Sequence, residues 1–381
     1  MMPSDGNDLD IITTGRRKWD LLEADIASAR QYIWIEYYRW REDASGLRIR
    51  DLIIRKLREG VEVKILLDDV ANAFIHKAYY DELRKAGAKL QFFTDTEHQL
   101  WEMFHGINCR NHRKILIIDG KVGYTGGMNL GIPYRDKWDD AHLRIQGPAV
   151  SSLARLFSQM WAERMGPALK RGMAKRLAEE DTIITTFSHL ETMIPTPCTF
   201  HDKTVQVASG RGGDHFLEEG VCRILQMAKH YVYFQTPYFC PTEPVLKAMK
   251  DASGRGVDVR IMIPAKADVI VMDTANSSFF KECIEEGISI ILTTGRFDHS
   301  KTIICDNYLS VIGSLNLDYR SLIINNEVIA LITDPEIALE RRDSFLERSK
   351  GAKKIDAAFL ASIYKKKGLL MRFWRRNSQQ L

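Results

Sequence analysis

Several features that mark common protein classes are scarce or missing in this chain. Its six cysteines are scattered and form no Cys-x-x-Cys pair, which argues against a zinc site and for reduced thiols in a cytosolic setting. No His-Glu-x-x-His motif occurs, and no Gly-x-x-x-x-Gly-Lys-Ser/Thr loop is present to cradle a nucleotide. The sequence therefore offers neither a recognisable metal site nor a nucleotide-binding loop.

Long apolar runs and a strong excess of one charge are missing as well. No apolar stretch approaches the length of a bilayer-spanning helix, and the first residues lack the basic and then apolar pattern of a secretory signal. The net charge of +4 is too small to indicate a nucleic-acid partner. With 381 residues, 45% of them apolar, the chain has the composition of a globular protein with a large core.

What the chain does contain is one motif written twice. His112-Arg113-Lys114 begins a His-x-Lys-x-x-x-x-Asp pattern that ends at Asp119, and His299-Ser300-Lys301 begins another that ends at Asp306. At matching offsets follow a Gly-x-x-Asn segment and a further acid: Gly126, Gly127, Asn129 and Asp140 in the first copy, Gly313, Ser314, Asn316 and Glu327 in the second. A single copy is a weak signal, but two copies with three matched offsets indicate a duplicated unit that builds one two-sided phosphate site.

The two halves also share a predicted order of strands and helices. Matching strands are expected at 33–38 and 231–236, 61–67 and 257–263, and 89–93 and 289–293. Matching helices are expected at 47–59 and 245–254, and at about 79–86 and 277–286, the last two ending at Gly87 and Gly287. Strands that alternate with helices favour an α/β fold with a mixed sheet in each half. We expect a first half at 1–165, a linker at 166–203, a second half at 204–350 and a basic tail at 351–381.

The repeated residues suit reaction at a phosphodiester, which gains negative charge as it reacts. Lys114 and Lys301 would supply fixed positive charge, and Asn129 and Asn316 would donate amide hydrogens to phosphate oxygens. Glycine permits close approach of backbone to a ligand. Gly127, together with Ser314 at the matching position, therefore completes the predicted phosphate-binding set.

Two histidines permit a double displacement. One would attack phosphorus and form a phosphohistidine, while the other would protonate the departing alcohol and deprotonate the incoming one. An imidazole needs a partner that fixes its tautomer, so Asp140 is predicted to serve His112 and Glu327 to serve His299, unless both are ordinary surface acids. Asp119 and Asp306 precede turns, so a structural role competes with a catalytic one.

These residues resemble the phospholipase D superfamily, and within it the bacterial cardiolipin synthases. The resemblance rests on the two motifs with their Gly-x-x-Asn segments, and on three further stretches: Trp138-Asp139-Asp140-Ala141-His142-Leu143-Arg144, Gln235-Thr236-Pro237-Tyr238-Phe239 and Asn326-Glu327-Val328. It covers about residues 20 to 345. It implies two phospholipase D-like halves, related by a pseudo-twofold axis, with one active site at their interface.

The resemblance also implies roles and a reaction. His112 would be the nucleophile and His299 the general acid-base. A phosphatidyl group would pass from one phosphatidylglycerol to another, giving cardiolipin and glycerol, without a metal or cofactor. Such synthases commonly begin with two membrane-spanning helices, which this chain lacks. We therefore expect a cytoplasmic protein in peripheral contact with the inner face of a bacterial cell membrane, or else a chain that works with a partner.

Two basic segments are candidates for that contact. One is the linker patch of Lys170, Arg171, Lys175 and Arg176, close to Pro195 and Pro197. The other is the tail from Lys365 to Arg376, which interleaves bases with Leu369, Leu370, Phe373 and other large apolar side chains. The tail fits equally well the solvated end of a terminal helix.

Other functions share the same chemistry. A hydrolase that admits water would release phosphatidic acid, because the acceptor is selected by pocket shape and water exclusion and not by the motifs. A nuclease or another phosphodiesterase would need a basic groove with stacking aromatics, which the modest net charge does not favour. A non-catalytic lipid-binding protein would have no need of two intact motifs.

Overall fold

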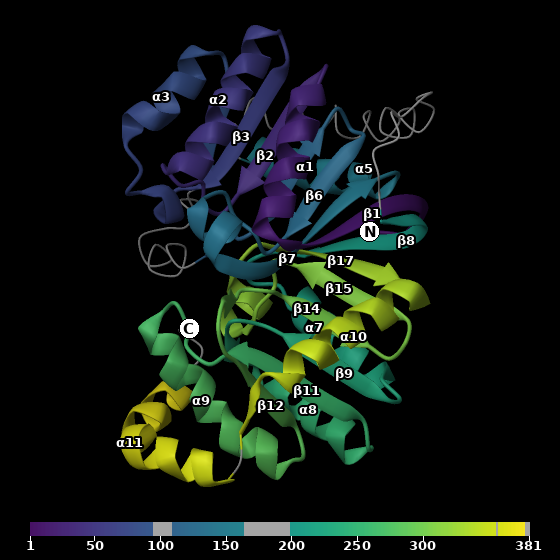
Figure 1. Cartoon of the computed structure of the whole chain (residues 1–381), viewed down its shortest axis with the longest axis vertical. Coiled ribbons are helices and arrows are strands. Elements are labelled where there is room, and N and C mark those ends of the chain that lie inside the picture. The colour runs from purple at the N-terminus through teal and green to yellow at the C-terminus, as the bar shows by residue number, and fades with distance from the viewer. Residues whose placement is uncertain (94–108, 164–198, 356, 378–381) are drawn as a thin grey trace. The chain divides into compact units, whose positions relative to one another are not determined.

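The computed structural model describes residues 1–93, 109–163, 199–355 and 357–377. Two compact units divide the chain (Figure 1). The first unit is made of Met1–Asp136 and His142–Val207, and the second of Lys137–Ala141 and Ala208–Leu381. A five-residue segment from the middle of the sequence thus belongs to the second unit.

The first unit is built on a mixed sheet. Its strand order is β8-β1-β7-β6-β5-β2-β3-β4. The strands are β1 (Ser4–Thr14), β2 (Tyr32–Tyr37), β3 (Glu62–Asp68), β4 (Lys89–Phe93), β5 (Lys114–Ile118), β6 (Val122–Gly126), β7 (Trp138–Gln146) and β8 (Phe200–Gly210). β2, β3 and β4 run parallel to one another, whereas β5 is antiparallel to β2 and to β6. Every residue of β5 and β6 is buried, as expected for apolar strands covered on both faces.

Helices cover this sheet. They are α1 (Gly15–Ser28), α2 (Ala44–Arg58), α3 (Lys77–Lys85) and α5 (Ala149–Glu163), with a short 3₁₀ turn at Val70–Asn72 and a π-helical turn at Pro133–Lys137. The carboxylate of Asp43 caps α2 by accepting the backbone N–H groups of Ser45 and Gly46, and basic residues fill the last turn of α2. Both features stabilise the ends of a helix.

The second unit repeats the plan. Its sheet has the order β18-β12-β11-β9-β14-β15-β17. The strands are β9 (Tyr231–Gln235), β11 (Asp258–Pro264), β12 (Ser289–Thr293), β14 (Thr302–Cys305), β15 (Leu309–Gly313), β17 (Glu327–Thr333) and β18 (Lys353–Lys354). Parallel strands β9, β11 and β12 correspond to β2, β3 and β4, and the β14–β15 hairpin corresponds to β5–β6. β13 (Phe297–Asp298) pairs with the first residues of β7, which belong to this unit.

The described part of this unit also contains helices, and the last of them is close to the end of the described chain. They are α7 (Phe216–Met227), α8 (Glu243–Gly254), α9 (Ile270–Glu285), α10 (Pro335–Lys350) and α11 (Ala357–Arg376), with a π-helical turn at Arg320–Ile324. α11 lies alongside α9 (Figure 1). Met371 is buried, and the Arg375 guanidinium lies 2.6 Å from the Glu282 carboxylate and 3.9 Å from the centre of the Phe279 ring.

The predicted α/β class with a mixed sheet in each half is confirmed. One helix boundary was wrong: α9 begins at Ile270 and not near Ser277. Val269 stands at its N-cap without a side-chain hydrogen bond, so the sequence offers no capping side chain there. The candidate linker patch and Cys198 lie outside the described residues, while the segment from Phe200 that was assigned to the linker forms the start of β8. No described helix is long and apolar enough to cross a membrane.

Candidate active site

In the second unit, a carboxylate faces the motif histidine. Nδ1 of His299 lies 2.7 Å from Oδ2 of Asp140, and both side chains are buried, with exposed fractions of 5% and 1%. The backbone supports the pair, because the His299 N–H donates to the Asp139 carbonyl at 2.7 Å and β13 pairs with Trp138 and Asp139. A carboxylate at Nδ1 favours the tautomer that carries its proton there. In that tautomer Nε2 is the ring nitrogen that does not carry the proton.

Aromatic rings flank the same imidazole. The ring centres of Trp138 and Phe297 lie 5.4 Å and 6.0 Å from that of His299. They add an apolar boundary to one side of the site, which strengthens electrostatic interactions by excluding water.

The pairing of acid and histidine differs from the prediction. Asp140 was assigned to His112 and Glu327 to His299, yet Asp140 contacts His299. The reason is that Trp138–Asp139 pairs with β13, so the segment belongs to the second unit although it follows the first motif in sequence. Equal offsets suggested pairing within each repeat, and no local pattern reveals a pairing between strands so distant in sequence.

Lys301 is buried against the histidine that precedes it. Its Nζ donates to the His299 carbonyl oxygen at 2.6 Å and lies 2.9 Å from Nδ1 and 3.2 Å from Nε2 of that ring. Burial lowers the pKa of Lys301 below its ordinary value, and the nearby Asp140 and Glu327 carboxylates oppose this effect. An anionic phosphate beside Lys301 would act in the same direction as these carboxylates, so the site favours an anionic ligand.

Glu327 and Ser314 are joined directly. Ser314 Oγ donates its proton to the Glu327 carboxylate and accepts the Val328 N–H at 3.0 Å. Ser314 therefore holds Glu327 in this structure. Asn316 is also buried, and its Oδ1 has no hydrogen-bond partner within the described part of the chain.

The first unit repeats the lysine geometry. Lys114 is buried and its Nζ donates to the His112 carbonyl oxygen at 2.6 Å, the same distance as in the second motif. Tyr38 lies against both residues: its ring centre is 4.8 Å from that of His112 and 5.3 Å from the Lys114 Nζ. His112 and Lys114 therefore project together beside the end of β2, as the alternation of a strand predicts.

Asn129 and Gly127 lie just beyond β6, and both are buried. Asn129 Oδ1 accepts the Arg39 N–H at 3.0 Å, and its Nδ2 donates to the Tyr134 hydroxyl at 2.9 Å. Through these two hydrogen bonds, Asn129 links Arg39, which follows β2, to Tyr134 in the π-helical turn. The expected role of Asn129 and Gly127 at a phosphate stays a prediction.

The two motif aspartates have one role in common. The Asp119 carboxylate accepts the backbone N–H groups of Arg30, Gln31 and Tyr32 at 2.7 to 2.9 Å. That of Asp306 accepts those of Lys229, His230 and Tyr231 at 2.9 to 3.1 Å. Both residues have a left-handed backbone, with φ of 52° and 49°. Both carboxylates thus hold the turn that follows the motif strand against the start of β2 or β9, which is the structural role considered for them. The catalytic alternative stays a prediction.

Comparison with known proteins identifies the family. The model of the cardiolipin synthase PLD-like domain matches residues 22–161 and 221–348. The chain is 33% identical over 361 residues to cardiolipin synthase 1 of Staphylococcus epidermidis, an alignment that covers 91% of this chain and 69% of that protein. It is 32% identical over 358 residues to the major cardiolipin synthase of Bacillus subtilis, covering 90% and 69%.

This chain belongs to the cardiolipin synthase family.

Solved structures agree at the level of the fold. Phosphatidylserine synthase of Haemophilus influenzae superposes with a TM-score of 0.70 at 15% identity, over 98% of this chain and 95% of that one. Polyphosphate kinase of Porphyromonas gingivalis gives 0.59 at 13% identity, over 96% and 53%. The predicted family, the two phospholipase D-like halves and the phosphatidyltransferase class of enzyme are thus confirmed.

Sequence reasoning gave no role to a set of buried residues around Asn111 in this cardiolipin synthase relative. The Asn111 N–H donates to Asp68 at 3.0 Å, and its Nδ2 donates to Glu36 at 2.9 Å. Burial raises the pKa of Asp68 to about 6, and also raises that of Glu36. Asp68 and Glu36 thus hold Asn111, the residue that immediately precedes His112. Its only sequence signal was the Asn-His-x-Lys form of the motif.

His142 is another residue to which the sequence gave no role. It is fully buried in the first unit, where burial, together with Lys18 and Lys114, holds its pKa well below the ordinary value. A histidine in that environment is neutral. Among the described residues, no group of three or more histidine, cysteine or acidic side chains is placed to hold a metal ion.

Proposed function

We propose that this enzyme transfers the phosphatidyl group of one phosphatidylglycerol to a second, forming cardiolipin and glycerol. The observation that carries the proposal is the buried Asp140–His299 pair beside Lys301. An imidazole held by a carboxylate exchanges protons efficiently, and a buried lysine stabilises the charge that develops on phosphorus-bound oxygens.

The proposed reaction has two displacements. In the first, a ring nitrogen of His112 attacks phosphorus, the bond from phosphorus to the glycerol oxygen breaks, and His299 gives that oxygen a proton. In the second, His299 takes the proton of the acceptor's hydroxyl as its oxygen attacks phosphorus, and the phosphorus–nitrogen bond breaks. This route requires both histidines to act on one phosphodiester. Lys114 and Lys301 would bind its oxygens, and Asn129, Asn316 and Gly127 are further candidates for that contact.

We also propose peripheral contact with an anionic membrane surface through α11. Leu369, Leu370 and Phe373 are exposed on it, and Lys365, Arg372 and Arg376 are exposed on adjoining positions of the same helix. Apolar side chains bordered by bases are typical of helices that lie in a membrane interface, where each base contributes about 1 kcal/mol.

The test uses labelled phosphatidylglycerol in vesicles, with separation of the lipid products. The wild-type protein should form cardiolipin and glycerol, while His112→Ala and His299→Ala should form neither. Asp140→Asn should lower kcat by about 100-fold with little change in KM, because the amide no longer holds the imidazole in its working tautomer.

A matched control is Asp139→Asn. The Asp139 carboxylate pairs with Arg296 at 3.0 Å and Arg348 at 3.4 Å, so its loss should leave turnover within about threefold. Phosphatidic acid in place of cardiolipin would establish a hydrolase that uses the same histidines. Turnover that survives replacement of either histidine would overturn the mechanism.

A further inference from the structure

Two adjoining cavities in the second unit extend from the neighbourhood of His299 to α11. The first, of about 420 Å³, is lined by Trp138 and Phe297, the two rings that flank His299. The second, of about 280 Å³, lies between α9 and α11. Pro264 and Ala265, at the carboxyl end of β11, line both cavities. The cavities therefore lie side by side, in line with the rule that ligands of parallel sheets bind at the carboxyl ends of the strands.

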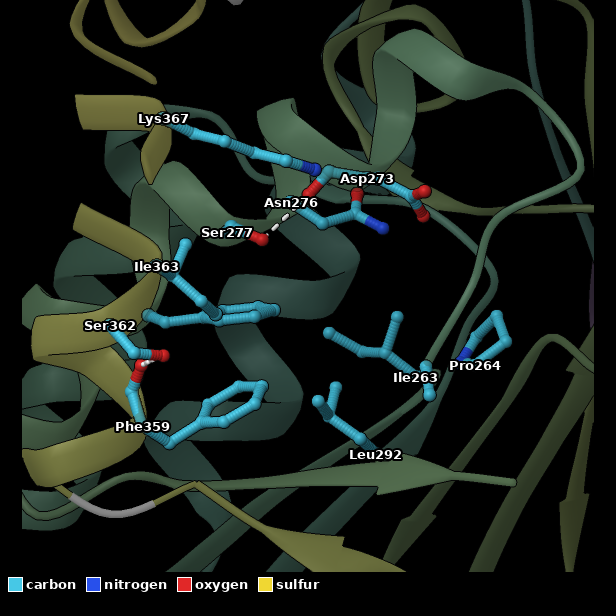
Figure 2. Close-up of a pocket in the computed structure, with 12 residues that line it drawn as sticks. Ile263, Pro264, Asp273, Asn276, Ser277, Leu292, Phe359, Ser362, Ile363 and Lys367 are labelled. Atoms are coloured by element: carbon cyan, nitrogen blue, oxygen red, sulfur yellow. Dashed lines mark hydrogen bonds between the residues drawn. The ribbon is translucent and has the colours of Figure 1, made fainter. Parts of the chain in front are cut away.

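The second cavity has an apolar part and a polar rim. Figure 2 shows Phe359, Ile263 and Leu292 facing one another across its lower part. Lys367 extends along the opposite side toward Asp273 and Asn276. A cavity with this division suits an amphipathic ligand, because apolar walls hold a hydrocarbon segment while the rim stays hydrated.

Two exposed leucines, Leu369 and Leu370, lie on α11 beyond the cavity. Leu370 follows Ile363 by seven residues, which is nearly two helical turns, so both lie on one side of the helix. The same spacing relates Leu369 to Ser362. Leu369 is 84% exposed and Leu370 is 50% exposed, whereas Ile363 and Ser362 line the cavity. A hydrocarbon chain that leaves a membrane surface at these leucines would pass Lys367 at the rim and then meet the apolar walls of the cavity.

We propose that the two cavities together form a groove, and that this groove holds one acyl chain of the phospholipid substrate whose phosphate reacts at His299. The inference rests on the proposed function and adds the place of the lipid tail. The volume of the second cavity is at the small end for ligand pockets, so it suits a segment of one chain and not a whole lipid. Lys266 and Arg296 line the first cavity, where they would lie near the phosphate and glycerol of the same molecule.

The test fills the second cavity with larger side chains and varies the length of the acyl chains of the substrate. Ile363→Trp fills it from α11, and Ser277→Phe fills it from α9, so that one variant remains if the other unfolds. Ala361→Trp is the matched control, because Ala361 is exposed on α11 and does not line the cavity. Cardiolipin formation is measured with dioleoyl and with dihexanoyl phosphatidylglycerol.

We expect filling to lower kcat/KM for the dioleoyl substrate at least tenfold and to leave that for the dihexanoyl substrate within about twofold. Ala361→Trp should resemble the wild type with both. Equal losses for the two lipids, or no loss with either filled variant, would overturn the groove while the transferase stands.

A binding measurement keeps the two proposals separate. Calorimetry with single-chain lauroyl lysophosphatidylglycerol below its micelle concentration needs no turnover. The wild type should bind it, and the filled variants should bind at least tenfold more weakly. That result supports the groove even if the wild type formed no cardiolipin, an outcome that would refute only the proposed function. Equal binding by all variants, or none by the wild type, refutes the groove.

Discussion

Ionisable side chains buried around the second motif have pKa values set mainly by their removal from water. Burial lowers the pKa of Lys301, and it raises the pKa of Asp318 to about 6. Asp318 follows Asn316 by two residues, accepts the Ser321 N–H at 2.7 Å and is further disfavoured as an anion by Glu327. Its negative charge is therefore a cost to the folded state.

This cost gives a pH-dependent prediction. Because the folded pKa of Asp318 lies above the ordinary 3.8, the stability that its neutral form contributes is complete below pH 3.8 and is lost as the pH rises through about 6. The free energy of unfolding of the wild type, taken relative to Asp318→Asn, should rise by about 2 kcal/mol from pH 7.5 to pH 4.5. Urea unfolding of both proteins at the two pH values measures it. A difference that does not change with pH would contradict the prediction.

The residues of the site were largely predictable, but the pairing of Asp140 was not. Histidine and lysine two positions apart at the start of a strand must share a face, so their proximity follows from local geometry. The contact of Asp140 with His299 depends on a pairing between β13 and β7 that no local pattern encodes. Roles for Asp119 and Asp306 were ambiguous for a related reason: an acid before a turn has the same local pattern whether it accepts backbone N–H groups or protons from a substrate.

Among the structural elements, the strand inside each His-x-Lys-x-x-x-x-Asp motif separates the motif histidine from the motif aspartate. His112 lies just before β5 and Asp119 just after it, so roughly 16 Å of strand stands between the reacting end and the fastened end. β14 places His299 and Asp306 in the same way. The histidine end carries the proposed chemistry, and the aspartate end joins two segments of the sheet.

Replacement of Asp119 should therefore affect stability more than catalysis. Asp119→Ala leaves three backbone N–H groups without their acceptor and should lower the free energy of unfolding by about 3 kcal/mol. Asp119→Asn, which keeps one acceptor oxygen and tolerates the left-handed backbone, should lose less. Both should retain wild-type kcat at temperatures where they are folded. Unchanged melting together with a collapse of kcat would assign Asp119 to the reaction.

Strands and helices could be anticipated where their apolar periodicity was regular, as in β4 and β12, whose predicted and observed bounds agree. The start of α9 was missed because Val269 offers no capping side chain. The π-helical turns after each Gly-x-x-Asn segment were not foreseen either, because a single extra residue in a helical turn leaves no periodic trace.

For the molecule as a whole, α11 is the proposed site of membrane contact. Its buried side is occupied by Met371 and by the Arg375–Glu282 ion pair, so removing residues 365 to 381 would also strip contacts from α9. Point changes on the exposed side are a cleaner test than truncation.

The triple change Leu369→Ser, Leu370→Ser and Phe373→Ser should lower cosedimentation with anionic vesicles at least tenfold, because it removes the side chains that would enter the interface. Phe74→Ser is the matched control, since Phe74 is 92% exposed in the first unit. Vesicles of zwitterionic lipid should bind the wild type weakly. Equal sedimentation of the wild type and the triple variant with anionic vesicles would exclude this face as the contact.

Because residues 137–141 belong to the second unit, the chain cannot be divided between its repeats without separating residues that are in contact. The chain could be expressed as two fragments divided between its repeats, and each fragment would carry a complete His-x-Lys-x-x-x-x-Asp motif. Yet the fragment with His299 would leave behind the acid that faces it, because Asp140 is encoded upstream. The acid beside the second motif therefore comes from the stretch of chain that follows the first motif. A repeat of the sequence is here not the same stretch of chain as a unit of the fold.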